Sequence, residues 1–294
     1  MEIEKHKIFE KRDLWWEKEG ISSPAVINMN DRTYMVYRAI GSDHISRLGL
    51  AISKDGENFQ QFEDPWLDAD ENIQAERLGL KDPRVVMFGR DVYLTYTAAS
   101  VYPASPKFSD VPWKLRVSLA RTRDFQSAER LGVMLSDLDS RSASLFPRQV
   151  QDRYWLLHSV DSNIFISNSK DLRRFDGGMR ILDTNETWAK VKVGVACPPI
   201  ETELGWLLIY YGVSEGGVYS TGVALLDKNS PGLVLKRSEK PFLKATEAWE
   251  KTGPMVVAGS LLEQDELSFY YGAGEGTIAL AKLKLTDILS SLQA

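Results

Sequence analysis

The sequence has few of the residues that form disulfides or bind metals. It contains one cysteine, Cys197, and three histidines among 294 residues. A single thiol cannot form a disulfide within the chain, and this composition suits a reducing compartment. Three histidines that lie far apart in the sequence do not form the clusters that bind zinc and related metals. We therefore expect a cytoplasmic protein with no metal and no organic cofactor.

Long apolar runs and blocks of like charge are also missing. No segment approaches the roughly 20 apolar residues that cross a bilayer, and the first residues are mostly charged where a signal peptide is apolar. The net charge of −5 is spread along the chain. We therefore expect neither a membrane nor a nucleic acid as a partner, which leaves an enzyme or a binding protein.

The sequence does contain an internal repeat. Five segments share a proline, a short apolar run, a polar turn and a second apolar run rich in tyrosine; the prolines are Pro24, Pro83, Pro147, Pro199 and Pro254. Two apolar runs around a turn predict a hairpin, and a third apolar run follows each pair. Four strands in about 50–60 residues are typical of a propeller blade. We predict one all-β domain over residues 1–294, a five-bladed β-propeller whose innermost strands start near residues 24, 83, 147, 199 and 254.

Three segments lie outside this repeat. Residues 1–16 precede the first unit, and we expect either a strand that closes the ring or an arm that contacts a neighbouring subunit. Residues 286–292 predict a short helix at the C-terminus. Residues 102–113 hold three prolines, which exclude a central strand, and the aromatic residues Tyr102, Phe108 and Trp113, which are of the kind that line sugar sites.

Asp82 is the first candidate for chemistry, because it stands directly before Pro83 at the mouth of a predicted hairpin. In a propeller the ends of the innermost strands meet at one face, so residues before the five prolines converge. These include Ser23, Asp82 and the runs 141–146 and 192–197. A ring of polar groups around one carboxylate predicts a glycoside site. The alternative is that Asp82 only caps a turn, which is a common role of aspartate.

Short motifs along the whole chain support the first interpretation. They are Tyr37-Arg38-Ala39, Ser46-Arg47, residues 76–84, Tyr96-Thr97-Ala98, Leu145-Phe146-Pro147, Leu157-His158, Trp188, Lys192-Val193-Gly194, residues 198–200, Gly205-Trp206-Leu207 and Tyr270-Tyr271-Gly272-Ala273. With these motifs in this order, the chain resembles glycoside hydrolase family 130, the β-mannoside phosphorylases and β-mannosidases. The resemblance implies a five-bladed propeller that cleaves terminal β-mannosidic bonds with inversion, by phosphorolysis that yields mannose 1-phosphate.

The same resemblance implies a role for each candidate. Asp82 would be the general acid that protonates the leaving glycosidic oxygen. Arg141 and Lys192 would bind inorganic phosphate, the co-substrate, which takes the place of the second carboxylate of an inverting hydrolase. The residues expected to hold sugar hydroxyls or to brace Asp82 are Ser23, Arg38, Arg47, Arg84, Tyr102 and Glu275. The expected partners are a small oligosaccharide and phosphate, and the resemblance also suggests a homo-oligomer.

The chain departs from the family pattern at four positions. Ser159 and Tyr211 stand where phosphorylases of the family usually have arginine and histidine, Lys81 replaces a glutamate, and Glu275 replaces an aspartate. The first two departures remove cationic partners for phosphate. They leave hydrolysis of the same β-mannosides as an alternative, with Glu275, Asp161 or Glu201 as the base that activates water. A sugar-binding propeller without catalysis is the second alternative.

Overall fold

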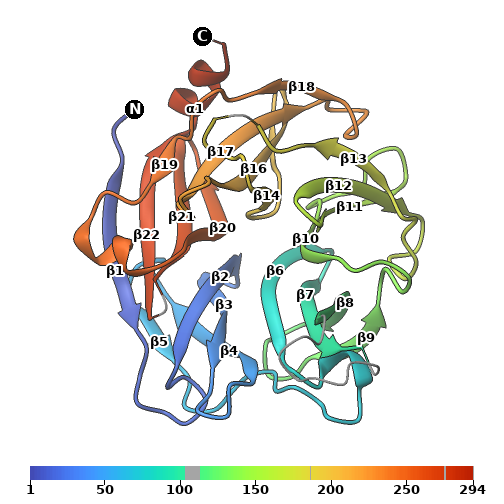
Figure 1. Ribbon diagram of the computed structural model, residues 1–294, viewed down its shortest axis with the longest axis vertical. Helices are drawn as coiled ribbons and strands as arrows, with labels where there is room; N and C mark the ends of the chain where they lie inside the picture. Colours follow the sequence, from blue (N-terminus) through green and yellow to red (C-terminus); the bar gives the residue numbers. More distant parts are fainter. Residues whose placement is uncertain (103–112, 186, 275, 294) are drawn as a thin grey trace.

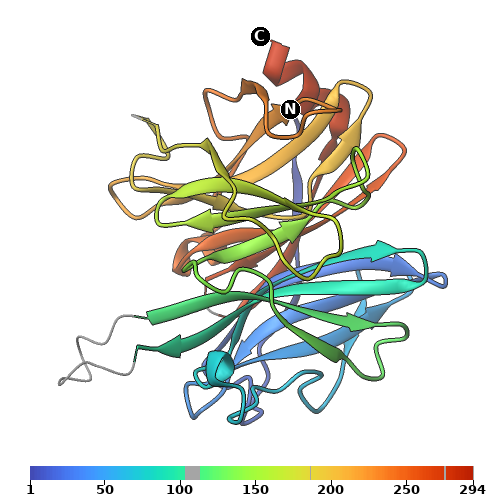
Figure 2. The ribbon, with the colours of Figure 1, turned by 90° about the vertical axis from the view of Figure 1, so that its right-hand side faces the viewer.

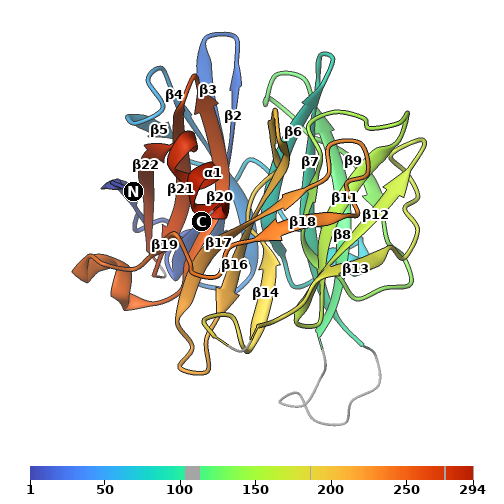
Figure 3. The ribbon, with the colours of Figure 1, turned by 90° about the horizontal axis from the view of Figure 1, so that it is seen from above.

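The computed structural model describes residues 1–102, 113–185, 187–274 and 276–293. Five antiparallel sheets stand around a common centre (Figure 1). Figure 2 shows the third sheet above the second, with their faces toward each other, and in Figure 3 the β2–β3 and β6–β7 turns point to the same side of the molecule. This arrangement confirms the predicted five-bladed propeller.

Each blade is one sheet, with the strand nearest the centre named first here. Blade 1 is β2 (Gly20–Met29), β3 (Arg32–Ile40), β4 (Ser46–Ser53) and β5 (Phe59–Gln61), and blade 2 is β6 (Leu80–Phe88), β7 (Asp91–Val101), β8 (Trp113–Thr122) and β9 (Glu129–Val133). Blade 3 is β10 (Arg141–Leu145), β11 (Tyr154–Val160), β12 (Asn163–Ser169) and β13 (Met179–Leu182). Blade 4 is β14 (Lys192–Val195) and β15 (Ile200–Thr202), which both pair with β16 (Gly205–Val213), then β17 (Tyr219–Leu226), which pairs with β18 (Val234–Arg237) and β19 (Leu243–Lys244). Blade 5 is β20 (Met255–Glu263), β21 (Glu266–Ala273), β22 (Thr277–Lys284) and β1 (Glu4–Glu10).

The hydrophobic core is divided among the interfaces between blades. Among the described residues there are five buried clusters, and each joins two neighbouring blades. The cluster between blades 5 and 1, for example, contains Tyr270 and Leu280 from blade 5, Val26 and Met35 from blade 1, and Trp16 from the segment before β2. Because each blade buries both faces of its sheet in this way, the apolar repeat in the sequence specifies a closed ring rather than five separate sheets.

The two ends of the chain meet at blade 5. Strand β1 pairs antiparallel with β22, so the first of the two expectations for residues 1–16, a strand that closes the ring, is confirmed. The helix α1 (Leu285–Gln293) follows β22 and buries Ile288 and Leu292 in the cluster between blades 4 and 5. The Thr286 backbone N–H and hydroxyl donate to the Asp265 carboxylate at 3.0 and 2.9 Å, which satisfies a donor at the start of the helix.

Two innermost strands start earlier than the prolines indicate. In blade 3 the strand β10 begins at residue 141 and Pro147 follows it, and in blade 4 the strand β14 begins at residue 192 and Pro199 follows it. In blade 3 the innermost strand therefore starts before the predicted residue 147. In blade 4 the predicted start near residue 199 matches β15, which begins at Ile200, but β14 precedes it. Proline has no N–H to donate to a sheet, so it also fits just after a strand, and the repeat of prolines does not determine on which side of the strand each one lies.

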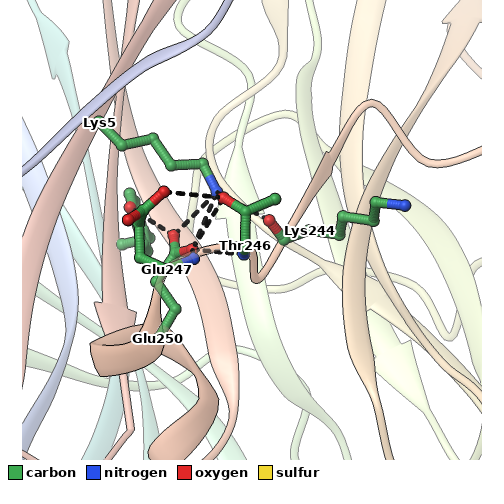
Figure 4. Close-up of polar contacts among 6 residues, drawn as sticks. Lys5, Lys244, Thr246, Glu247 and Glu250 are labelled. Carbon is green, nitrogen blue, oxygen red and sulfur yellow. Dashed lines mark hydrogen bonds and ion pairs between the residues drawn. The ribbon is translucent and has the colours of Figure 1, made fainter.

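Buried glutamates link the inner and outer strands in three blades. Glu17, Glu76 and Glu250 each lie just before an innermost strand, the last two in the 3-10 helices Gln74–Glu76 and Ala248–Thr252. Each accepts a hydrogen bond from a tyrosine of the second strand and pairs with a cation: Tyr37 at 2.6 Å with Arg12, Tyr96 at 2.6 Å with Arg130, and Tyr271 at 2.8 Å with Lys5. Figure 4 shows the Glu250 carboxylate with Lys5 and Thr246. Burial raises the pKa of all three tyrosines, so they remain hydrogen-bond donors.

In blade 3 the inner and outer strands are linked by an uncharged histidine instead of a buried glutamate. His158 lies on β11 with no exposed surface, and its two ring nitrogens lie 2.9 Å from the hydroxyls of Ser140 and Ser167. Burial lowers the pKa of His158 to about 4, so the imidazole is neutral near pH 7. The histidine therefore connects the start of the innermost strand to β12 without a buried charge.

We expect Tyr96→Phe to destabilise the protein by about 1.5–3 kcal/mol, the usual value of a hydrogen bond to a charged group. The substitution removes the donor to Glu76, a carboxylate that is only 2% exposed, and leaves Arg130 as its remaining side-chain partner among the contacts described. Urea unfolding measures the loss. Tyr34→Phe is the matched control, because Tyr34 packs on Phe125 and contacts no buried carboxylate in the described part of the chain. Equal losses in the two variants would contradict the prediction.

Candidate active site

A cavity of about 270 Å³ lies at the centre of the ring, where the innermost strands begin. All five blades contribute to its wall: Ile21, Ser22, Ser23, Arg38 and Ile40 from blade 1, Asp82 from blade 2, Arg141 and Ser142 from blade 3, Lys192, Tyr211 and Tyr219 from blade 4, and Pro254, Val256, Gly272 and Gly274 from blade 5. Five of the candidates from the sequence are therefore brought together here: Ser23, Arg38, Asp82, Arg141 and Lys192. The closed ring thus gathers side chains from distant parts of the sequence in one space.

The same backbone distortion presents three of these side chains. The pairing with the second strand shifts at the start of β2, β6 and β10, which is the signature of a β-bulge. Inside the three shifts, Ser23, Asp82 and Ser142 have positive φ angles of 53°, 51° and 47°. A residue other than glycine in this region costs on the order of 1–3 kcal/mol. The fold thus accepts strain at the points where its innermost strands face the cavity.

The Asp82 carboxylate is held by hydroxyls from two blades. The hydroxyl of Thr97, on β7, donates to its Oδ2 at 3.1 Å, and the hydroxyl of Ser142, on β10, donates to the same atom at 3.2 Å. Thr97 Oγ1 also accepts the backbone N–H of Ser142 at 3.1 Å, which ties the two hydroxyls together. The orientation of Asp82 therefore depends on the contact between blades 2 and 3.

Opposing effects determine the charge of Asp82. Burial raises the pKa of the carboxyl, but the positive charges of Arg84, Arg38 and Lys192 and the hydrogen bond from Thr97 lower it. The net result is a pKa below the usual value for aspartate. Asp82 is therefore a carboxylate near pH 7.

Two cations of the cavity wall, Arg141 and Lys192, are held by neutral groups. An Arg141 Nη atom donates to the backbone carbonyl of Asp161 at 2.9 Å. The Lys192 Nζ atom lies 5.3 Å from the centre of the Tyr211 ring. Neither contact neutralises the positive charge, so both side chains can still pair with an anion in the cavity.

Arg84 lies beneath the cavity rather than in its wall. It is only 1% exposed, and its guanidinium donates to the backbone carbonyls of Pro83 at 2.7 Å and Val195 at 3.3 Å. Its charge acts on Asp82 through the electrostatic effect described above. Of the two roles expected from the sequence, this position fits bracing of Asp82, and Arg84 does not line the cavity.

Of the two remaining arginine candidates, one lines the cavity and the other does not. Arg38 lines the cavity and donates from Nε to the Ser46 hydroxyl at 2.9 Å. Arg47 does not line it; its guanidinium pairs with Asp43 at 2.7 Å and with Asp68 at 2.8 Å. Successive residues of a strand point to opposite faces, so the choice between these positions depends on the register of β3 and β4.

Tyr102, the next candidate, is not brought to the cavity wall. The Tyr102 hydroxyl donates to the Asp139 carboxylate at 2.7 Å, and Tyr102 is not among the residues of the wall. Glu275 and Phe108 lie outside the described residues. A contact between Glu275 and a substrate stays a prediction.

The described residues give no support for a metal or membrane site. Among them, no cluster of three or more His, Cys, Asp and Glu side chains is arranged to hold a metal ion. None of the described helices has the length and apolar character needed to cross a membrane. The single thiol, Cys197, is fully buried, and burial raises its pKa to about 11, which keeps it protonated.

Comparison with known proteins assigns the chain to a family. The family model described as beta-1,4-mannooligosaccharide phosphorylase, that of glycoside hydrolase family 130, matches residues 19–294. A 1,2-beta-oligomannan phosphorylase from Thermoanaerobacter sp. (strain X514) is 34% identical over 297 residues, which cover 97% of both chains. The chain belongs to glycoside hydrolase family 130. The resemblance seen in the motifs is thereby confirmed.

Other members of family 130 agree in sequence and in fold. A beta-1,2-mannobiose phosphorylase from Listeria innocua serovar 6a is 31% identical over 260 residues, which cover 85% of this chain and 69% of the relative. The solved structure of a beta-1,2-mannobiose phosphorylase from Listeria innocua, in complex with beta-1,2-mannobiose, has a TM-score of 0.87 at 24% identity and covers 100% of this chain and 99% of its own. A thermostable family-43 glycoside hydrolase has a TM-score of 0.67 at 15% identity, covers 95% of this chain and 94% of its own, and shares the fold alone.

The site residues named from the sequence of this family 130 protein leave out four residues that the structure places in or beside the cavity. Ser142 and Thr97 hold Asp82, and Tyr211 and Tyr219 line the blade 4 side of the cavity. Thr97 pairs with Lys81 across the hairpin, so a register for that hairpin would have placed it beside Asp82. Ser142 lies in the run 141–146 that the sequence predicts to converge on the centre, but nothing singled it out within that run, because the proline of its blade lies after the strand instead of inside the bulge.

Proposed function

We propose that this family 130 protein is a β-mannoside phosphorylase that cleaves a terminal β-mannosidic bond with inversion and forms mannose 1-phosphate. One observation carries the proposal. Among the described residues of the cavity wall, Asp82 is the one carboxylate, and it shares the cavity with Arg38, Arg141 and Lys192. An inverting hydrolase uses a second carboxylate to activate water. A cavity with one acid and several cations suits an anionic nucleophile instead.

In the proposed reaction, Asp82 acts as the general acid. Its protonated carboxyl gives the proton to the glycosidic oxygen as the bond from that oxygen to C1 breaks. A phosphate oxygen, held by Arg141 and Lys192, forms a bond to C1 from the opposite face of the mannose ring. The leaving sugar departs with the proton, Asp82 is left as a carboxylate, and the product is the α-anomer of mannose 1-phosphate.

Phosphate binding would also favour the protonated form of Asp82. The charge of Lys192 is one of the effects that hold the pKa of Asp82 below its usual value. A phosphate bound to Lys192 and Arg141 offsets that positive charge, and a bound sugar excludes water, so both ligands raise the pKa of Asp82. The acid is therefore expected to take up its proton as the ternary complex forms, although the charges of the protein alone keep it ionised.

The named activities of relatives support the proposal and suggest which linkage to test first. The relatives that are 34%, 32% and 31% identical are phosphorylases of 1,2-beta-oligomannan or beta-1,2-mannobiose. A beta-1,4-mannooligosaccharide phosphorylase from Ruminococcus albus is 26% identical over 198 residues, which cover 62% of this chain and 59% of the relative. We therefore propose a β-1,2-linked mannoside as the first substrate to test, with the β-1,4 isomer beside it.

We expect mannose 1-phosphate to form from β-1,2-mannobiose when inorganic phosphate is present, and no cleavage when it is absent. Proton NMR of the products reports both the phosphate ester and its anomeric configuration. Free mannose released equally well without phosphate would replace phosphorolysis by hydrolysis. Binding of the disaccharide without turnover under both conditions would instead support a sugar-binding propeller.

Four expectations from the sequence stay predictions beside this proposal. They are the cytoplasmic location, the absence of an organic cofactor, the homo-oligomer and the single domain over residues 1–294. Sedimentation measures the assembly directly, and a pure monomer would contradict the third. Dialysis against a chelator that leaves turnover unchanged would support a reaction without a metal.

A further inference from the structure

A lysine and an exposed indole stand beside the cavity without a role in the reaction described above. Lys81 precedes Asp82 on β6, and its Nζ atom lies 4.1 Å from the centre of the Trp113 ring. Trp113 is the first residue of β8 and is 52% exposed. The charges that act on Lys81 are those of Arg38 and Asp82, both of which line the cavity. The ammonium group therefore lies close to the cavity, next to the general acid.

The positive charge of Lys81 is poorly compensated. In the described part of the chain no ion pair joins its ammonium to a carboxylate within 4 Å, and its closest described partner is the Trp113 ring. Burial and the nearby charge of Arg38 lower the pKa of Lys81 to about 8, against the smaller opposite effect of Asp82. At pH 7 the group is still protonated. An anion placed beside it would relieve this unfavourable environment.

The neighbouring Lys114 makes a similar contact with an aromatic ring but has a carboxylate nearby. Its Nζ atom also lies over an aromatic ring, 5.4 Å from the centre of Tyr102. There, however, Asp139 accepts hydrogen bonds from Tyr102 and Arg116 and provides a negative charge in the same cluster. Each of these two lysines of blade 2 thus makes its own cation–π contact. Lys81 differs from Lys114 because the described residues around it include no carboxylate other than the catalytic Asp82.

We propose that the leaving sugar of the preferred substrate carries a carboxylate or a phosphate, which Lys81 binds while the sugar ring lies against Trp113. This inference rests on the proposed function, because it places the leaving group on the side of Asp82. An exposed aromatic face with one directed polar group is a common way to bind a sugar ring, and an ammonium pairs well with either anion. An anion at Lys81 would also raise the pKa of Asp82 and so favour the protonated acid.

Calorimetric titration of the intact protein at pH 7 tests this directly. Glucose, glucuronate and glucose 6-phosphate are the probes, in buffer with inorganic phosphate to occupy the Arg141 and Lys192 side. They share one ring and differ at C6, so a difference in affinity among them reports the anionic group. We expect at least one anionic probe to bind about ten times more tightly than glucose or better, and the preferred probe identifies the anion.

Two variants make the result specific. Lys81→Met should reduce the preference for the anionic probe to less than about twofold, whereas Lys114→Met, the matched control, should keep it. Equal binding of glucose and both anions to the parent protein would overturn the inference, as would a preference that survives in Lys81→Met. Because binding needs no turnover, this result is independent of phosphorolysis. A protein that prefers the anionic probe yet never forms mannose 1-phosphate would refute the proposed reaction and leave the binding preference standing.

Discussion

Asp82→Asn is expected to lower kcat/KM for phosphorolysis of β-1,2-mannobiose by a factor of about 10³, within the range that general acid catalysis contributes. The amide has nearly the same shape, and its oxygen can still accept hydrogen bonds from Thr97 and Ser142. It cannot give a proton to the glycosidic oxygen. The loss should therefore fall on the chemical step, and steady-state kinetics with mannose 1-phosphate as the measured product will report it.

The leaving group provides the decisive control for this variant. A dinitrophenyl β-mannoside leaves as a stabilised anion and needs no proton, so its turnover should fall less than about tenfold in Asp82→Asn. Asp91 lies in the same blade, and its carboxylate pairs with Arg123 outside the cavity wall. Asp91→Asn should therefore leave the turnover of both substrates unchanged. Full activity of Asp82→Asn on the disaccharide would show that another group is the acid. A loss of equal size on both substrates would indicate a role other than proton donation.

Asp82→Asn is also expected to destabilise the folded protein. In the native protein the charges of Arg84 and Arg38 hold the pKa of Asp82 down, so the ionised carboxylate stabilises the fold above its unfolded pKa, and this contribution is lost as the pH falls. The Asp82→Asn substitution would leave the buried Arg84 without that counter-charge. Thermal unfolding of the variant should be measured beside the kinetics, so that activity is compared at a temperature where both proteins are folded.

Lys192→Met is expected to raise KM for phosphate about 30-fold or more, because truncating one partner of a buried charge pair costs about 2–5 kcal/mol. The methionine keeps the length and apolar character of the side chain and can still pack on the Tyr211 ring. It removes only the charge that faces the anion. Initial rates at varied phosphate, with the mannoside saturating, separate this effect from any change in sugar binding.

Lys190→Met is the matched control for this second experiment. Lys190 lies just before β14, and its exposed ammonium pairs with Glu215 at 2.9 Å, away from the wall of the cavity. Its replacement should change KM for phosphate less than about twofold, since exposed ion pairs contribute little. An unchanged KM for phosphate in Lys192→Met would move the phosphate site elsewhere. A rise in KM for the sugar alone would make Lys192 a sugar ligand.

Part of the site was accessible from the sequence because strand ends in a propeller converge. Asp82, Arg141 and Lys192 were selected as residues at the starts of innermost strands or by resemblance, and all three line the cavity. Arg47 was selected by resemblance and lies elsewhere, paired with Asp68. The difference depends on strand register, since a shift by one residue turns a side chain to the other face of the sheet.

The sequence by itself determined the number of blades, because the alternation of apolar strands and polar turns is a local property that repeats along the chain. The tertiary structure alone decided which side chains face the centre. The bulges that turn Ser23, Asp82 and Ser142 inward depend on pairing with a second strand, and the hydroxyl of Ser142 reaches Asp82 across 60 residues of sequence. Such contacts form only when separate blades close into a ring, so no local pattern encodes them.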